Sequence, residues 1–387
     1  MPPPDHQPAP ALIWADRDDA APPLFGLPPA ERHARTLKKA GLGDTPIQTS
    51  TSSDATLSEQ LTETLATATG PVIALEEGAA TDPRLIAALA RAEGSLVART
   101  EEGAALRLMP GTTLPPATTL PELADALAAA GTRQLSQNDF DGFIGVLRRD
   151  LPFWILRPRD AAAARQAERW MFLSNYKGST DMLTSHVFPP LVWPLTRWSA
   201  RYGLSPNAVT IVSILFTVLA AVFFWQGQLA AGLAAAYAMA VLDSVDGKLA
   251  RVTLADSALG NVLDHGLDIV HPPFWWLAWA HGAATLGGPG WLWPAAWIMT
   301  GFYIADRLVL MVAKQRFGRG LHAMTALDGR VRSFISRRNI NLLILTVGLM
   351  IGLETLAFAL VVGWQAATCL WHALRTAMLY PLGRAAA

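Results

Sequence analysis

Hydrophobic and polar positions follow different patterns in the two halves of the chain. Up to about residue 150, short apolar runs at residues 11–14 and 71–75 predict buried strands. Helical periodicity of apolar positions predicts helices at residues 31–40, 83–93, 120–130 and 139–150. Strands that alternate with helices indicate an α/β layer domain with a partly parallel sheet. Residues 44–58 are rich in Ser, Thr and Asp and predict a loop.

The second half contains apolar runs that are long enough, with their flanks, to cross a lipid bilayer. Such a crossing takes about 20 residues in a helix. About six spans are predicted, around residues 207–227, 229–242, 274–280, 291–305, 340–353 and 356–374. Residues 181–202 combine apolar positions with Arg197 and Arg201, which predicts an amphipathic helix at the membrane interface.

The predicted fold class is therefore a two-part chain. An N-terminal soluble α/β domain is followed by an all-α domain of six transmembrane helices, with an interfacial amphipathic helix before it. The predicted boundaries are 1–160 for the soluble domain, 161–203 for the linker and interfacial helix, and 204–380 for the membrane domain.

Composition and charge support this division. The chain of 387 residues is 51% hydrophobic and only 16% charged, whereas soluble proteins average about a quarter charged residues. Residues 1–170 hold 22 acidic and 16 basic residues, and residues 171–387 hold 9 and 15, so the halves carry −6 and +6. A nucleic-acid-binding protein would be more basic overall and would lack the long apolar runs. The single cysteine, Cys369, excludes an internal disulfide and a Cys-based zinc site.

Basic residues predict the topology. Residues 314–338 contain seven Lys and Arg, whereas the connections at 226–228 and 281–290 contain none. The positive-inside rule then places this basic loop and both termini in the cytosol, in a multi-pass protein of the cell membrane. The polar, Pro-rich residues 1–10 lack the pattern of a signal peptide, so we expect none.

Four carboxylates lie within 26 residues, at the ends of two neighbouring predicted spans. They are Asp243, Asp246, Asp264 and Asp268. The first two share one face of a helix, and Gly260, Asp264 and Asp268 follow at intervals of four on the next. A short turn, with Asp256 as predicted N-cap, makes the helices antiparallel, so the carboxylates converge. They would repel each other in a medium of low dielectric, and Mg²⁺ or Mn²⁺ would relieve this.

Two further residues suggest a nucleotide. Gly247 would let the backbone approach one closely, and Arg251, two turns beyond Asp243 on the same side, would neutralise a diphosphate. Together these residues match the pattern D-x2-D-G-x2-A-R-x8-G-x3-D-x3-D at all eight defined positions. This pattern resembles the motif of the CDP-alcohol phosphatidyltransferase family. Residues 204–210, L-S-P-N-A-V-T, look like the Pro-Asn-x-x-Thr opening of the family's first transmembrane helix.

The resemblance covers roughly residues 180–380 and implies a six-helix membrane domain, usually a homodimer, with a cytosol-facing site. It implies two ions, Mg²⁺ or Mn²⁺, held by Asp243, Asp246 and Asp264. Asp268 would complete the cluster and act as general base. The donor's cytidine diphosphate would contact Gly247, Ala250, Arg251 and Gly260.

The implied reaction is the attack of an acceptor hydroxyl on the phosphorus that bears the donor alcohol. The donor would be CDP-diacylglycerol or a CDP-polyol, and CMP would leave. In this scheme the metal stabilises the leaving phosphate and Asp268 takes the proton.

Other polar residues have two interpretations. His271 either orients Asp268 or contacts substrate, or it is an interfacial histidine before a Pro kink. Cations near the basic loop either contact lipid headgroups and set the topology, or bind a substrate phosphate. These cations are Arg330, Arg332, Arg337, Arg338 and, before the interfacial helix, Lys177.

Residues 24–41 read L-F-G-L-P-P-A-E-R-H-A-R-T-L-K-K-A-G, and residues 71–78 read P-V-I-A-L-E-E-G. With these segments, the order of elements in the N-terminal domain resembles that of sugar-nucleotidyltransferase domains. Such a domain precedes the transferase in bifunctional inositol-phosphate cytidylyltransferases. That family has a Gly-rich G-x-G-T-R loop after its first strand, but this chain reads W-A-D-R-D-D-A-A-P-P there. We therefore expect a degenerate, noncatalytic domain that serves in regulation, docking or stability. Glu76 and Glu77 either mimic a metal-binding acid or are loop carboxylates, and we favour the second interpretation.

The leading hypothesis is a membrane-embedded phosphotransferase that takes a CDP-alcohol and a hydroxyl acceptor in the lipid bilayer. A bifunctional cytidylyltransferase and transferase is the alternative. A noncatalytic membrane anchor would be expected to lack motif residues, yet all are present. A metal-ion transporter would carry polar residues through the middle of several spans, whereas these spans are polar mainly at their cytosolic ends.

Overall fold

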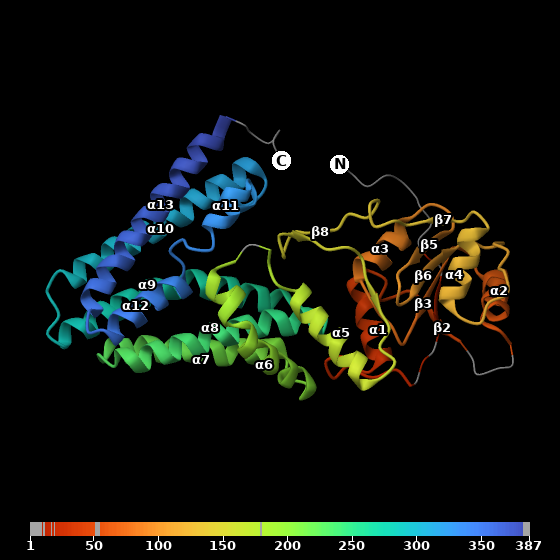
Figure 1. The fold of residues 1–387 in the computed structure, drawn as a ribbon, viewed down its shortest axis with the longest axis horizontal. Helices are drawn as coiled ribbons and strands as arrows, with labels where there is room; N and C mark the ends of the chain where they lie inside the picture. Colours follow the sequence, from red (N-terminus) through yellow and green to blue (C-terminus); the bar gives the residue numbers. More distant parts are fainter. Residues whose placement is uncertain are drawn as a thin grey trace. The chain divides into compact units, whose positions relative to one another are not determined.

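The computed structural model describes residues 10, 12–16, 18, 20–50, 55–178 and 180–381. The side chains of residues 258, 259, 261–265, 267 and 268 lie outside this description. The chain forms two compact units, drawn in Figure 1. The first comprises Met1–Gly145, Arg149–Asn175 and Val252–Ala255, and the second comprises Val146–Arg148, Tyr176–Arg251 and Asp256–Ala387.

A six-stranded mixed sheet, in the order β2-β1-β3-β6-β5-β7, is the centre of the first unit. Its strands are β1 (Leu12–Asp16), β2 (Ile47–Thr49), β3 (Val72–Glu76), β5 (Leu96–Arg99), β6 (Ala104–Leu108) and β7 (Arg133–Gln134). β1 pairs in parallel with β2 and β3, whereas β6 is antiparallel to β3 and β5. The predictions of the two strands and of a partly parallel sheet are confirmed, although residue 11 lies outside the described residues.

Helices cover both faces of this sheet, as Figure 1 shows. They are α1 (Pro29–Lys39), α2 (Leu57–Thr67), α3 (Pro83–Arg91) and α4 (Leu120–Ala129), and α5 (Ala161–Ser174) follows them in the chain. Leu61 of α2 and Leu123 of α4 pack in one hydrophobic core, and Leu37 of α1 and Leu85 of α3 pack in the other. Every residue of β3 is buried, as expected for a strand between two helical layers. Three of the predicted helices are thus confirmed, as α1, α3 and α4.

Two predictions for this unit are wrong. The helix predicted at residues 139–150 is an antiparallel pair, β8 (Phe143–Ile144) and β9 (Arg149–Asp150). Gly142 and Gly145 interrupt the helical pattern there, because glycine costs about 1 kcal/mol in a helix interior. The loop predicted at 44–58 contains β2, whose three residues are all exposed and thus lack a strand pattern. Residues 51–54 of that prediction lie outside the described residues.

The second unit is helical. Its long helices are α6 (Pro189–Arg201), α7 (Pro206–Trp225), α8 (Leu229–Val252), α9 (Ala258–Thr285), α10 (Leu292–Phe317), α12 (Arg338–Met350) and α13 (Glu354–Leu379). Short helical turns are η1 (Leu183–Val187), η2 (Leu321–Ala323) and α11 (Ala326–Val331). The predicted amphipathic helix at 181–202 is present as η1 and α6, and its place at a membrane interface stays a prediction.

Close packing of α7 against α9 organises the core of this unit. Phe224 of α7 meets the rings of Trp275 and Trp279 of α9 edge to face. A Cβ atom on Gly282 would lie 1.8 Å from the carbonyl oxygen of Phe224, so only glycine permits this approach.

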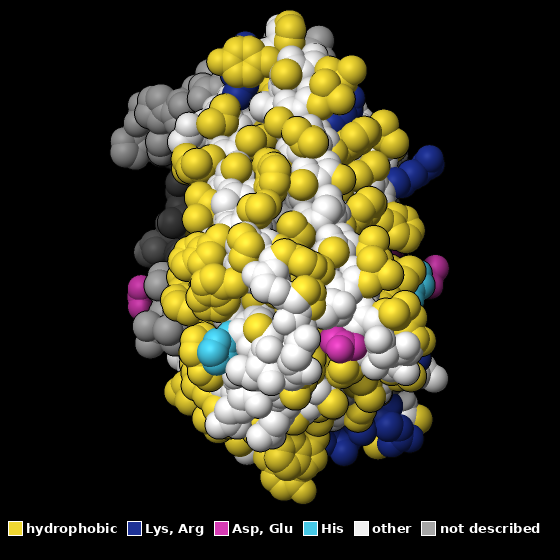
Figure 2. Space-filling model, turned by 90° about the vertical axis from the view of Figure 1, so that its left-hand side faces the viewer, with side chains coloured by type: hydrophobic (Ala, Val, Ile, Leu, Met, Phe, Trp, Pro, Cys, Tyr) yellow, Lys and Arg dark blue, Asp and Glu magenta, His cyan; other side chains and the backbone are white. Residues whose placement is uncertain are grey.

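Four helices among the described residues are long and apolar enough to span a membrane: α7, α8, α10 and α13. The apolar α12 is shorter, with 13 residues. Figure 2 shows a face of the molecule on which hydrophobic side chains predominate. These features indicate a multi-pass membrane protein. The count of six spans and the cytosolic side of the termini stay predictions.

Candidate active site

The first half of the motif lies near the carboxyl end of α8, where Asp243 and Asp246 are one turn apart. Asp246 is 5% exposed, and its Oδ2 atom accepts a hydrogen bond of 2.6 Å from the Thr210 hydroxyl. Its Oδ1 atom accepts from the backbone N–H of Gly247 at 2.5 Å. Asp243 Oδ2 forms an ion pair with Arg338 Nη2 at 2.7 Å. Both carboxylates are thus held in fixed orientations.

The amino-terminal turn of α7 contacts both halves of the motif. Thr210 binds Asp246 of α8, and the Asn207 Oδ1 atom accepts a hydrogen bond of 3.2 Å from the Ser257 hydroxyl, just before α9. Asn207 and Thr210 were not predicted as site residues, although their segment matches the Pro-Asn-x-x-Thr pattern. Their spacing of three residues puts both side chains on one face of a helix, and this pattern could have indicated a shared role.

A side chain at Gly260 would force the side chains of Asn207 and Ser257 to move. A Cβ atom there would lie 2.8 Å from Asn207 Oδ1 and 2.9 Å from Ser257 Oγ. The N-cap of α9 is Ser257, whose hydroxyl accepts from the Gly260 N–H at 2.9 Å, so the prediction of Asp256 as N-cap is wrong by one residue. The extended backbone of Ser257 brings its short side chain to that N–H.

Gly247, Ala250 and Arg251 lie on α8, as the motif requires. A Cβ atom on Gly247 would lie 3.4 Å from Arg251 Nη1, so the guanidinium lies over this glycine. The intervening Lys248 is 4% exposed, and its Nζ atom lies 3.0 Å from the centroid of the Tyr176 ring, a cation–π contact. Lys248 was not predicted as a site residue.

The predicted phosphate-binding cations have different surroundings. Arg338 pairs with Asp243, Arg337 Nη1 lies 3.8 Å from Asp181 Oδ2, and Arg330 and Lys177 are exposed. Burial opposes ionisation of Asp181. Arg337, Thr184 and Asn339 nevertheless hold the pKa of Asp181 below its ordinary value.

Arg332, Arg148 and Arg337 lie close enough to repel one another electrostatically. Within the described part of the chain, Arg332 Nε is buried and has no hydrogen-bond partner. Burial, and then repulsion by Arg337 and Arg148, lower the pKa of Arg332 to about 8. Arg148 belongs to this unit with residues 146–148, where the Leu147 carbonyl accepts from the Gly178 N–H at 2.8 Å. Arg148 was not predicted as a site residue, because its segment was predicted as a helix.

The second half of the motif lies on α9, where Asp264 and Asp268 are one turn apart. Their side chains lie outside the described ones, so convergence of four carboxylates stays a prediction. Among the described residues, no group of three or more His, Cys, Asp or Glu side chains is placed to hold a metal. Asp243 and Asp246 nonetheless supply hard oxygen donors that suit Mg²⁺ or Mn²⁺. His271 is 4% exposed, and its ring meets Trp275 with centroids 4.6 Å apart.

Comparison with known proteins identifies this helical region. Residues 204–375 match the family model for CDP-alcohol phosphatidyltransferase. They form a CDP-alcohol phosphatidyltransferase domain. The match includes the α7 residues Asn207 and Thr210 and both halves of the motif. Enzymes of this family generally depend on divalent metal ions.

Curated relatives match parts of the chain. Archaetidylinositol phosphate synthase of Pyrococcus horikoshii is 39% identical over 90 residues, which cover 22% of this chain and 47% of that protein. Cholinephosphotransferase 1 of Xenopus laevis is 32% identical over 152 residues, covering 35% and 37%. Phosphatidylinositol phosphate synthase of Mycobacterium marinum is 32% identical over 103 residues, covering 25% and 44%. The chain spans less than half the length of each.

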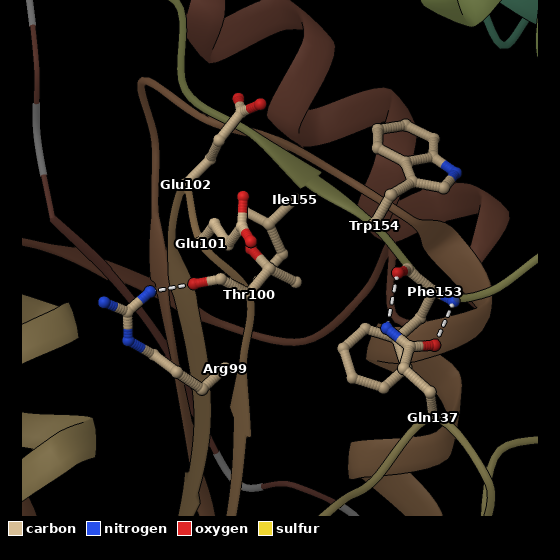
Figure 3. Close-up of a pocket in the computed structure, with 8 residues that line it drawn as sticks. All are labelled: Arg99, Thr100, Glu101, Glu102, Gln137, Phe153, Trp154 and Ile155. Carbon is tan, nitrogen blue, oxygen red and sulfur yellow. Dashed lines mark hydrogen bonds between the residues drawn. The ribbon is translucent and has the colours of Figure 1, made fainter.

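The first unit has a cavity of about 430 Å³ outside the transferase domain, shown in Figure 3. Its lining residues are Arg99, Thr100, Glu101, Glu102, Gln137, Phe153, Trp154 and Ile155. Several polar groups there already bind their neighbours. The Gln137 amide exchanges two hydrogen bonds of 3.0 Å with the Phe153 backbone, and Glu102 accepts from the Arg157 N–H at 3.1 Å.

Two carboxylates lie side by side in the sheet of the first unit. Asp16 and Glu76 are register partners at the ends of β1 and β3. Glu76 is 2% exposed, pairs with Arg157 at 2.7 Å and accepts from the Ala104 N–H. Burial raises the pKa of Glu76, and Arg157 opposes that rise. The interpretation of Glu76 as a loop carboxylate is therefore wrong, because it ends a buried strand and Arg157 neutralises it.

Proposed function

We propose that this protein is an integral-membrane phosphotransferase of phospholipid or related biosynthesis. It moves a phosphatidyl or phosphopolyol group from a CDP-alcohol to an acceptor hydroxyl and releases CMP. The observation that carries this proposal is the complete motif, with Asp243 and Asp246 fixed by Arg338 and Thr210. The names of the curated relatives, all synthases or phosphotransferases, support it.

In this proposal, Mg²⁺ or Mn²⁺ binds to Asp243, Asp246, Asp264 and Asp268, as two ions. Bound metal supplies electrostatic stabilisation of charge on the phosphates. Thr210 contributes by donating to Asp246 Oδ2, which limits how that carboxylate turns. Arg338 neutralises part of the charge on Asp243 and so lowers the repulsion between the carboxylates.

The donor nucleotide occupies the surface around Gly247, Ala250, Arg251 and Gly260. Arg251 lies over Gly247, where its guanidinium would face a diphosphate. Asp268 accepts the proton of the acceptor hydroxyl as its oxygen bonds to phosphorus. The bond between this phosphorus and the CMP phosphate oxygen breaks, and CMP leaves.

We further propose that the acceptor carries a phosphate, held by Arg148, Arg332 and Arg337. Half-buried guanidiniums that repel each other favour an anion between them. Two of the relatives named above are inositol phosphate synthases, which agrees with such an acceptor. Arg330 and Lys177 are exposed and suit lipid headgroups instead.

We also propose that the active site faces the cytosol and that the protein is a homodimer. We propose that the N-terminal unit is noncatalytic, because its buried Glu76 forms an ion pair with Arg157 and is therefore not available to bind a metal ion. The bifunctional enzyme remains the alternative. A noncatalytic anchor and a metal-ion transporter are less consistent with the complete motif.

Assay of the purified protein for CMP release tests the proposal. A panel of CDP-alcohols and of free and phosphorylated acceptors would be supplied with Mg²⁺ or Mn²⁺. We expect CMP release with at least one pair, loss of activity in EDTA, and recovery on adding excess metal. Undiminished activity in chelator would contradict the metal cluster, and no CMP release across the panel would favour the anchor.

A further inference from the structure

One segment of the transferase motif belongs to the N-terminal unit. Residues 252–255 directly follow Arg251 and precede Gly260, so they connect the two halves of the motif. They group with the first unit, whereas Arg251 and Gly260 belong to the second. Val252 and Thr253 are 0% and 7% exposed. The first half of this connection is therefore buried, and Leu254 and Ala255 are half-buried.

Two arginines of α1 bind the backbone of this connection. Arg32 Nη2 donates to the Val252 carbonyl at 2.9 Å, and Arg35 Nη1 donates to the Thr253 carbonyl at 2.8 Å. Arg32 also donates to the Leu24 carbonyl at 3.1 Å. Glu31 pairs with Arg35 at 2.6 Å and orients it. The two guanidiniums are thus directed by further contacts within the first unit.

These contacts suit the end of a helix. The last carbonyls of α8 lack partners within the helix and form the negative end of its dipole, which favours cations. The following residue, Leu254, has a φ of +54°, a left-handed conformation that costs roughly 1–2 kcal/mol for a residue with a Cβ atom. Such conformations persist where surrounding contacts hold them.

We propose that Arg32 and Arg35 are positioning residues for phosphotransfer: by capping the carboxyl end of α8, they fix the connection between the two halves of the motif. This inference rests on the proposed function, because turnover is one of its readouts. The physical link is short. Arg251 is the neighbour of the capped Val252, and Gly260 opens the helix that carries Asp264 and Asp268. Small displacements of reacting groups cost up to about 10²-fold in rate.

Arg35→Met in the full-length protein is the sharpest test. Arg32 is 4% exposed, so its replacement endangers folding, whereas the Arg35 side chain is 34% exposed. Lys38→Met is the matched control, since it removes an exposed cation from the same helix. Hydrogen exchange of peptides covering residues 252–260 would be measured together with kcat, KM and the unfolding midpoint.

For Arg35→Met we expect exchange in these peptides to accelerate about tenfold, and kcat to fall about tenfold with an unchanged unfolding midpoint. Arg35→Lys should recover part of both, and Lys38→Met should match the wild type. Wild-type exchange or wild-type kcat in Arg35→Met would overturn the inference, as would a loss of kcat that only follows a lower unfolding midpoint. Absence of CMP release by the wild type would defeat the proposed function instead, and accelerated exchange would still support the cap.

Discussion

At the residue scale, the Thr210 hydroxyl helps to hold the carboxylate of the buried Asp246. Thr210→Val keeps the shape of the side chain but removes the donor to Oδ2. Loss of a partner to a buried charged group costs about 1–3 kcal/mol, and the freed carboxylate would turn from its orientation. We expect CMP release to fall about tenfold and to need more Mg²⁺.

Thr210→Ser is the matched control, because serine retains the hydroxyl. It should keep most of the activity and the metal requirement of the wild type. Metal titrations of the three proteins would decide the matter, and an unchanged requirement in Thr210→Val would show that the bond to Asp246 has no part in metal binding.

Substitutions of Asp268 and Asp243 should affect turnover and substrate binding differently. If Asp268 is the general base, Asp268→Asn should lower turnover by roughly 10²-fold or more and leave CDP-alcohol binding largely intact. Asp243→Asn should instead weaken metal and nucleotide binding. Turnover and equilibrium binding would be measured for both variants. Near-normal turnover of Asp268→Asn would refute its assigned role.

At the scale of elements, how well the sequence predicted the structure depended on how regular each pattern was. The strand ending at Glu76 and the helix that opens at Pro83 have continuous apolar patterns and were predicted correctly. The strand β2 was not predicted, because an exposed edge strand shows no alternation of apolar and polar residues. The motif identified Asp243 and Asp246, but the contacts of Arg338 and Arg148 depend on segments far apart in the sequence. No local pattern records such contacts.

Helix α1 should make the first unit sensitive to acid through His33. This side chain is 8% exposed, its Nε2 atom has no hydrogen-bond partner among the described residues, and burial lowers its pKa to about 4. The unfolded chain takes up a proton near pH 6.5, whereas the folded state resists until about pH 4. The stability from neutral His33 is therefore complete above pH 6.5 and is lost as the pH falls towards 4. By pH 5 the loss is about 2 kcal/mol.

Unfolding midpoints at pH 7.5 and 5.0 check this prediction. His33→Gln removes the titrating group, so its midpoint should fall less between these values than that of the wild type. His186→Gln, a change at an exposed histidine, should behave as the wild type. Equal falls in the wild type and His33→Gln would contradict the assignment to His33.

At the scale of the whole molecule, the two units differ in what their acidic residues can do. Asp243 and Asp246 belong to the complete motif, and their carboxylates supply hard oxygen donors for a metal ion. The buried Glu76 instead forms an ion pair with Arg157. The first unit also lacks the Gly-rich phosphate loop after its first strand. We propose that the first unit acts on the transferase by holding residues 252–255, through Arg32 and Arg35 of α1, rather than by making its substrate.

This contrast predicts that the full-length protein does not make a CDP-alcohol. With CTP, Mg²⁺ and a phosphorylated alcohol, pyrophosphate release should stay at background, because no glycine-rich backbone is present to bind the triphosphate. The same preparation should release CMP from a preformed CDP-alcohol, which shows that the protein is folded. Arg157→Met frees Glu76 from its partner and should still release no pyrophosphate, since the phosphate loop is missing in that variant too. Robust CTP-dependent pyrophosphate release by the wild type would make the protein bifunctional and would give the first unit a catalytic role.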